Sequence, residues 1–354
     1  MFRLGVSTTL NPSHRSLPDR IRVAAYAAMA YWFYRWDWGE SVAVDGLARA
    51  GRALDDRAFS DFVDCELERW VAQSRTTGSP NPMGPAVALL DAVGEQRMAD
   101  ESAARECLDR LAERLHNEQP DSRGFAPERD RQLLFVDSLY GLPAFLAGYR
   151  QLVDDSAITV AAVARTVEHC RILQSSSGLF GHFADLDSSE TPHIAWGRGN
   201  GWAVLGLSDL LLAVPPEVPG MAEIRERFTA LLDGLRATQS PGGLWRNVID
   251  DPTSYPEAST TLFVVAAITQ AVDAELVEAG YLALADEGWS ALEHRIDVSG
   301  HVVGVSYRPG VNTDPARYEH TPVTGAYPWG QGPYLRAACQ RLTHDARPLR
   351  DESP

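Results

Sequence analysis

The first candidate for chemistry is an aspartate inside an otherwise apolar stretch. Asp137 follows four apolar residues in the segment LLFVDSLYGLPAFLAGY and stands where an apolar helix should open. Burial disfavours the charged form of a carboxyl group, so this position should raise the pKa of Asp137 toward the range of a proton donor. An aspartate that caps a helix N-terminus fits the same position equally well. Asp137 is therefore predicted to be a general acid, with a capping role as the alternative.

A second group of candidates lies in the glycine-rich stretch HIAWGRGNGWAVLGLSDLL. Arg198 is a planar cation suited to a carboxylate, and Trp196 and Trp202 can stack on the face of a sugar ring. The glycines between them let the backbone approach a ligand closely. A helix-capping turn with packed tryptophans is the structural alternative. The composition favours recognition of an anionic ligand by this stretch.

Other candidates lie in loops or at the starts of apolar segments. They are Trp38, Asn81, His182, Glu257, Trp329 and Gln331. His182 suits a structural role and a site role equally, and Trp38 is a stacking platform or a packing residue. Glu257 is a second carboxylate, an acceptor for sugar hydroxyls or a helix cap, and Asn81 is a turn residue that could also contact the ligand. We predict that all of them line one substrate site around Asp137.

The elements that must position these residues are helices. Apolar residues at three- and four-residue spacing predict twelve of them, over 18–34, 39–52, 56–74, 84–95, 100–116, 135–151, 156–173, 200–214, 220–239, 257–273, 276–295 and 330–343. Some are charged on one face, as in ADESAARECLDRLAERL, and others are apolar nearly all round, as in EASTTLFVVAAITQAV. Helices of the second kind should be buried inside those of the first. Their alternation predicts an all-α (α/α)6 barrel, with short strand-like pieces only in GLFGHFA and HVVGVSYR.

This architecture brings the candidates together. If the six apolar helices run parallel inside the ring, their N-termini share one face, where the Gly-, Trp- and acid-bearing segments meet. Helix N-termini also present free N–H groups and a positive dipole end to a ligand. An aromatic-lined cleft that attracts anions points to a small acidic oligosaccharide as the partner.

Composition excludes several classes of function. The formal net charge is −16 and every basic side chain is Arg, without a run that could neutralise phosphates, so nucleic acid is not an expected partner. The four cysteines are widely spaced in apolar patterns, which predicts buried thiols rather than a metal site. No apolar run is long enough for a membrane span, and no secretory leader is evident. We expect one cytoplasmic catalytic domain over 1–354 with a short polar tail from about 345; the sequence does not indicate the oligomeric state.

Taken together, the motifs resemble those of glycoside hydrolase family 105, with family 88 as a more distant relative. The resemblance covers nearly the whole chain. It is carried, in order, by WDWGESVAVDGL, FVDSLYGLPAFLAGY, GLFGHFAD, AWGRGNGWAVLGLSDLL, GLWRNVIDDP, YPEASTTLF, GVSYRPG and WGQGPYLRA.

The resemblance implies an unsaturated rhamnogalacturonyl or glucuronyl hydrolase. Such enzymes hydrate the 4,5 double bond of the unsaturated uronic acid that polysaccharide lyases leave, and they release it as a keto-uronate. By position, Asp137 resembles the family's general acid and base, and His182, Trp196, Arg198 and Trp202 match positions around the unsaturated sugar. The resemblance implies no metal and no cofactor.

One departure from the family pattern falls before the second apolar helix. Members usually carry a further aspartate there, where this chain reads GSPNPMGPAVALL with Asn81 near that position. The change predicts altered substrate preference or weaker activity. Two alternatives to the hydrolase stay open. One is another (α/α)6 sugar enzyme, either an inverting glycosidase using Asp137 with Glu257 or an epimerase. The other is a non-catalytic sugar-binding homologue, which the missing aspartate alone supports.

Overall fold

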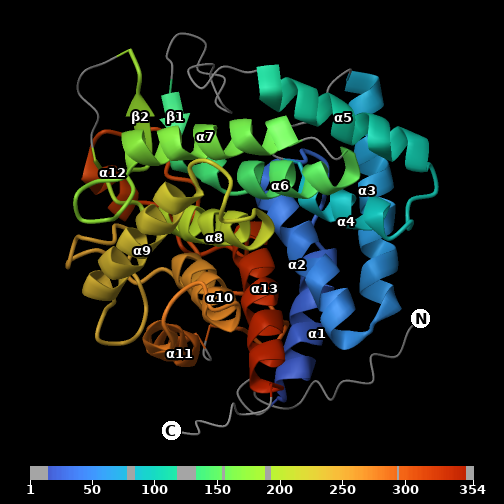
Figure 1. Ribbon diagram of the computed structural model, residues 1–354. Coiled ribbons are helices and arrows are strands. Elements are labelled where there is room, and N and C mark those ends of the chain that lie inside the picture. Colours follow the sequence, from blue (N-terminus) through green and yellow to red (C-terminus); the bar gives the residue numbers. More distant parts are fainter. Residues whose placement is uncertain are drawn as a thin grey trace, which may run out of the picture.

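A computed structural model of the chain describes residues 15–77, 84–117, 133–153, 156–187, 193–292 and 295–347. Its helices alternate along the chain between an outer and an inner layer (Figure 1). The outer helices are α1 (Leu17–Met29), α3 (Arg57–Thr77), α5 (Glu101–Asn117), α7 (Ser156–Leu173), α9 (Met221–Thr238) and α11 (Leu282–Ala291). The inner helices are α2 (Trp38–Leu54), α4 (Ala86–Gly94), α6 (Leu142–Val153), α8 (Gly197–Ala213), α10 (Ala258–Asp273) and α13 (Pro328–Asp345).

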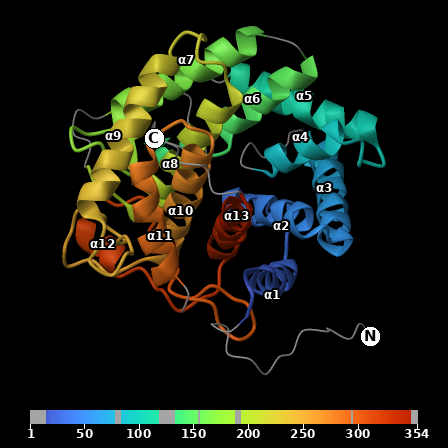
Figure 2. The ribbon, with the colours of Figure 1, turned by 60° about the horizontal axis from the view of Figure 1, so that its bottom comes forward.

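The inner helices close into a ring. Each packs against the next, from α2 through α4, α6, α8 and α10 to α13, and α13 returns to α2. The outer helices lie around this ring, as the rotated view in Figure 2 shows. The chain is therefore an (α/α)6 barrel of six helical hairpins, and the predicted fold is confirmed.

The distribution of apolar residues explains which helix lies inside. In α10 every residue from Ala258 to Ala271 is buried, because neighbouring helices cover all of its sides. In α9 the buried residues form one stripe that includes Ile224, Phe228 and Leu235, and the charged face points outward. A helix with apolar residues all round gains free energy only when it is enclosed, whereas a striped helix needs contact on one side.

The segment around Asp137 differs from the predicted continuous helix over 135–151. Its chain forms strand β1 (Leu133–Phe135) and a one-turn 3-10 helix, η2 (Val136–Leu139), before α6 begins at Leu142. Gly141 has a φ of +54°, which interrupts helical geometry. Strand β1 pairs antiparallel with β2 (Phe183–Asp185). Asp137 therefore lies in a tight turn ahead of an inner helix rather than at its N-cap.

Other differences are smaller. The predicted helix over 276–295 is a 3-10 turn, η3 (Ala279–Tyr281), followed by the shorter α11. Of the two strand-like pieces, GLFGHFA contributes to β2, whereas HVVGVSYR contributes only one isolated bridge, from Val302 to Ile296. An additional short helix, α12 (Pro315–Glu319), precedes α13.

The N-termini of several inner helices meet on one face of the barrel. The ring of Trp38, the first residue of α2, lies 5.6 Å from that of Trp202 in the first turns of α8. It lies 5.1 Å from the ring of Trp329, the second residue of α13. These contacts place aromatic side chains from distant parts of the sequence at a common mouth.

Two further features concern thiols and membranes. Cys107, Cys170 and Cys339 are buried and unpaired, as expected, but Cys65 is exposed, because it lies on the outward face of the striped outer helix α3. Among the described helices, none combines the length and the apolar character that a lipid bilayer requires.

Candidate active site

A pocket opens at the mouth of the barrel beside Asp137. It is an open cleft with a cavity volume of about 170 Å³, and its walls come from α2, β1, η2, the segment before α8 and the loop before α12. Its lining residues are Trp38, Phe135, Asp137, Ser138, His182, Trp196, Arg308, Pro309, Gly310 and Val311. Of the residues predicted for the site, the structure thus brings Trp38, Asp137, His182 and Trp196 together around one cavity.

Asp137 has the environment of a proton donor. Its side chain is 17 % exposed, and its Oδ2 atom is buried without a hydrogen-bond partner in the described part of the chain. Burial raises the pKa of Asp137 to about 6, although the positive charges of Arg198 and Arg308 act in the opposite direction. The turn that carries it is anchored by a hydrogen bond from the Val136 N–H to the His182 carbonyl, 3.0 Å long.

His182 lies next to Asp137 as a neutral side chain. Its Nε2 atom is 3.8 Å from Oδ2 of Asp137, and its Nδ1 atom is 2.6 Å from the hydroxyl of Tyr318. Burial, helped by the charge of Arg198, lowers the pKa of His182 to about 3. The imidazole is therefore uncharged at neutral pH, and it contacts Asp137 without forming an ion pair.

The four predicted tryptophans divide into two pairs. Trp38 and Trp196 line the pocket, Trp38 with a partly exposed ring and Trp196 as a buried part of the wall. Trp202 is buried behind them with its ring 4.3 Å from that of Phe263. Trp329 is also buried, and its indole N–H donates to the Ser306 carbonyl. The first pair therefore forms part of the pocket wall, and the second pair packs against Trp38 from inside the barrel.

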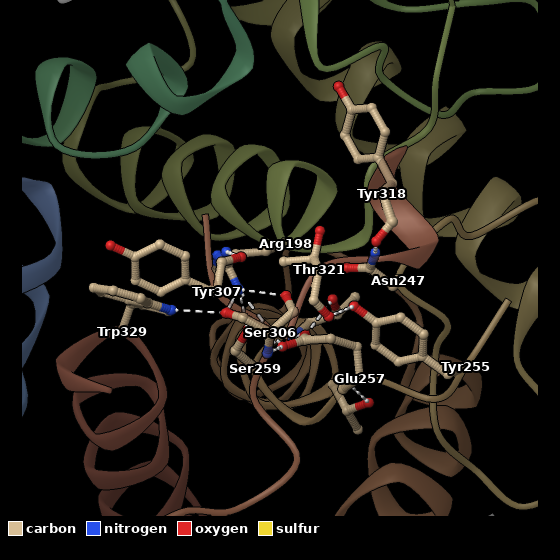
Figure 3. A network of polar contacts seen from close by, with 12 residues as sticks. Arg198, Asn247, Tyr255, Glu257, Ser259, Ser306, Tyr307, Tyr318, Thr321 and Trp329 are labelled. Atoms are coloured by element: carbon tan, nitrogen blue, oxygen red, sulfur yellow. Dashed lines mark hydrogen bonds and ion pairs between the residues drawn. The ribbon is translucent and has the colours of Figure 1, made fainter. Parts of the chain in front are cut away.

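Arg198 has partners that its predicted role did not include. The side chain is completely buried, and Nη1 donates to the carbonyl and the hydroxyl of Ser306 at 2.9 Å each. Nη2 donates to the Tyr307 carbonyl, also at 2.9 Å, and Glu257 lies 3.5 Å from Nη1. Figure 3 shows these contacts. The guanidinium does not line the pocket, so in this structure it holds the loop around Ser306 rather than presenting a free edge to a carboxylate.

Glu257 and Gln331 also have structural partners. The fully buried carboxylate of Glu257 caps α10 by accepting from the Thr260 N–H, and it accepts from the Ser306 N–H (Figure 3). Gln331 accepts from the Val302 N–H, and its amide donates to the carbonyls of Ala24 and Gly300. Neither residue reaches the pocket. Of the three roles open to Glu257, the structure supports the helix cap.

Asn81 lies outside the described residues, as does the first part of the segment that departs from the family pattern, residues 78–83.

The structure also brings in residues that the sequence did not single out. Arg308 lines the pocket, with Nη2 2.7 Å from Oδ2 of Asp37. Tyr318, on α12, is buried against His182. The only sequence signal for Arg308 was a cation beside Pro and Gly in GVSYRPG, and Gly310 has the φ of +68° that such a turn uses. Nothing in the sequence near Tyr318 indicated a role in the site, because its contact with His182 spans 136 residues.

In the described parts of the chain, no three side chains of His, Cys, Asp or Glu form a group that could hold a metal ion. The described residues around the pocket offer one carboxyl group of raised pKa, a neutral imidazole, a guanidinium and aromatic walls.

The chain is similar in fold and in sequence to several known proteins. Solved structures with the same fold include a possible member of the GH105 family from Salmonella enterica (TM-score 0.82, 21% identity, 97% of this chain and 96% of that one). Another is the unsaturated glucuronyl hydrolase of Bacillus sp. GL1 (TM-score 0.67, 16% identity, 92% and 96%). In sequence, the chain is 24% identical over 317 residues to the unsaturated rhamnogalacturonyl hydrolase YesR of Bacillus subtilis, covering 84% of this chain and 87% of that protein.

The resemblance noted from the motifs is thereby confirmed. A family model shows how much of the chain it covers. The model of Glycosyl Hydrolase Family 88 matches residues 22–344, which is most of the chain. Because a match of that length includes all six hairpins of the barrel, the chain belongs to glycosyl hydrolase family 88.

Proposed function

We propose that this glycoside hydrolase hydrates the 4,5 double bond of a terminal unsaturated uronic acid on lyase-generated oligosaccharides. The observation that carries the proposal is a single carboxyl group of raised pKa on the wall of an aromatic pocket. Among the described residues that line this pocket, Asp137 is the one acid. Relatives named unsaturated rhamnogalacturonyl hydrolase and unsaturated 3S-rhamnoglycuronyl hydrolase support this class of sugar.

One carboxyl group suffices for hydration. In its acid form Asp137 donates a proton to C4 of the enol ether, and positive charge develops at C5. The resulting carboxylate then accepts a proton from the water that adds to C5, which restores the acid. The C5 hemiketal opens to a keto acid, and C1, now a hemiacetal, releases the remaining sugar chain as an alcohol.

The pocket also provides the other needs of this reaction. The partly exposed ring of Trp38 supplies an apolar face for the flat, unsaturated ring, and the buried Trp196 closes the wall beside it. The imidazole of His182 is neutral, so it lies beside Asp137 without forming an ion pair. An ion pair would favour the carboxylate over the acid form that donates the proton.

The inverting glycosidase is less well supported. That reaction requires two carboxyl groups that flank the glycosidic bond with room for a water between them. Glu257, the second acid considered, is fully buried and bonded to Thr260 and Ser306. It would have to leave these partners and the nearby charge of Arg198 to reach a substrate.

A direct assay tests the proposal. The protein is incubated with unsaturated disaccharides that lyases release from rhamnogalacturonan, glycosaminoglycan and ulvan, and the ultraviolet absorbance of the conjugated enol-ether acid is followed. We expect this absorbance to disappear with at least one substrate and to persist with Asp137→Asn, which keeps the shape of the side chain. Absorbance that stays constant across the panel would overturn the proposal.

A further inference from the structure

The pocket needs a cation if it takes an acidic sugar, and two arginines lie near Asp137. Both of them act on its pKa through their charge. They differ in what their guanidinium groups can offer. Arg198 is completely buried and bonded through both terminal nitrogens to Ser306 and Tyr307, so a substrate could reach it only after this loop had moved.

Arg308, by contrast, has an open edge. Its side chain is 33 % exposed and lines the pocket. Within the described residues its guanidinium donates one hydrogen bond, from Nη2 to Asp37. An arginine carries five N–H donors in a planar fork. The Nε–H of Arg308 is buried and one Nη2 hydrogen bonds to Asp37, so the donors left for a ligand are on the two terminal nitrogens.

The guanidinium of Arg308 is also held in place. Its central carbon lies 4.7 Å from the ring centre of Trp38 and 5.1 Å from that of Trp329. Asp37, which fixes the other side, is itself the N-cap of α2 and accepts from the Gly39 N–H at 3.0 Å. A cation oriented by two aromatic rings and a capping carboxylate loses little conformational freedom when it binds an anion.

We propose that Arg308 binds the carboxylate of the unsaturated sugar and determines the preference for an acid, and that Asp37 is its positioning residue. This inference rests on the proposed function. The carboxylate of the unsaturated sugar is attached to C5, the atom next to the C4 that Asp137 protonates. A cation that binds it must therefore share a pocket wall with Asp137, and Arg308 does.

The test compares an acid with its ester. The best disaccharide of the panel and its methyl ester are assayed with the wild type, Arg308→Met and Arg308→Lys. Methionine keeps apolar contact with the two tryptophans but has no charge. We expect kcat/KM for the acid to fall about ten- to hundredfold in Arg308→Met, the loss typical of one hydrogen-bonded charge pair. The ester should change little, and lysine should recover part of the loss.

Arg171 provides a matched control. It is an exposed arginine on the outer helix α7, and its guanidinium bonds to Glu223 of α9, away from the pocket. Arg171→Met should leave kcat/KM for both substrates unchanged. If Arg308→Met preferred the acid over the ester as strongly as the wild type does, the inference would be overturned while the proposed function stood.

Binding separates the remaining outcomes. In the Asp137→Asn background, calorimetry measures affinity for the disaccharides of the panel without turnover. If the double variant Asp137→Asn/Arg308→Met binds a disaccharide more weakly than Asp137→Asn does, the inference is supported. This holds even if the wild type hydrates no disaccharide, in which case only the proposed function fails. Equal binding with and without Arg308, or no binding of any disaccharide, would refute the carboxylate role.

Discussion

At the scale of single residues, opposing effects determine the protonation of Asp137. Burial favours the neutral acid, while the charges of Arg198 and Arg308 favour the carboxylate. Burial is the larger effect, and the pKa is raised to about 6 rather than lowered. A group with this pKa can give and take a proton near neutral pH, which one residue must do twice in the proposed reaction.

The pH dependence of activity follows from this shift. The reaction begins with the acid form of Asp137, so kcat/KM should be highest below pH 6 and decline above it, by about tenfold per pH unit once the carboxyl group has ionised. A pH–rate profile measures this decline, on a substrate that does not itself titrate in the same range. If kcat/KM already declined from about pH 4, the ordinary pKa range of an aspartate, the profile would contradict the raised pKa of Asp137.

Tyr318 is predicted to set the tautomer of His182. Its hydroxyl has one proton, and the nearest acceptor is Nδ1 of His182 at 2.6 Å rather than the Asn312 carbonyl at 3.4 Å. Donation to Nδ1 leaves the imidazole proton on Nε2, the atom that faces Asp137. In Tyr318→Phe we expect a mixture of tautomers in the nitrogen NMR shifts of His182 and a kcat lower by about two- to tenfold.

Tyr255 offers the control for that experiment. Its hydroxyl bonds to the Thr321 carbonyl just beyond α12, not to the imidazole. Tyr255→Phe should leave the His182 tautomer unchanged. Unaltered nitrogen shifts in Tyr318→Phe as well would refute the positioning role of Tyr318.

At the scale of elements, the important contact is the one between η2 and α8. Gly206 of α8 lies so close to the turn that a Cβ placed on it would be 1.7 Å from the Leu139 carbonyl oxygen. The 3-10 turn that carries Asp137 therefore rests on the bare backbone of an inner helix. A side chain at this point must push the turn outward.

We predict that Gly206→Ala impairs both stability and catalysis. The added methyl group should cost about 1–3 kcal/mol of unfolding free energy, as overpacking of a core does, and displacement of Asp137 should lower kcat. Gly94→Ala is the control, because a Cβ there meets nothing within 4 Å. Denaturant unfolding and initial rates on both variants test the contrast, and wild-type kcat in Gly206→Ala would show that the turn tolerates the shift.

At the scale of the whole molecule, one buried ion pair connects separate parts of the barrel. Arg198 belongs to α8 and Glu257 caps α10, and both bind Ser306 in the loop that leads to α12. Both side chains are completely buried. The same pair that withdraws Arg198 from the pocket therefore holds the loop on which Arg308 approaches it.

Loss of one partner should thus destabilise the protein. In Glu257→Gln the Arg198 charge remains buried without compensation, and we expect a loss of about 3–5 kcal/mol in the free energy of unfolding. Glu101→Gln removes an exposed pair with Arg105 within α5 and should cost less than about 1 kcal/mol. Equal midpoints of denaturation for the two variants would argue against the structural role of Glu257.

The sequence by itself determined the architecture. Helical periodicity and the distinction between striped and fully apolar helices are local properties, because each helix carries the pattern of the surface that it buries. They identified inner helices such as α10 and outer ones such as α9, and the order of the motifs led to the family. The acid at Asp137 was also readable, since four apolar neighbours indicate burial.

Only the tertiary structure decided which of the other polar residues face the pocket. The bond from Arg198 to Ser306 spans 108 residues, and the one from Arg308 to Asp37 spans 271. Whether a side chain is exposed or neutralised depends on partners at such distances, and no local pattern contains them. For this reason the sequence pointed to Arg198 for a role that the structure makes available to Arg308.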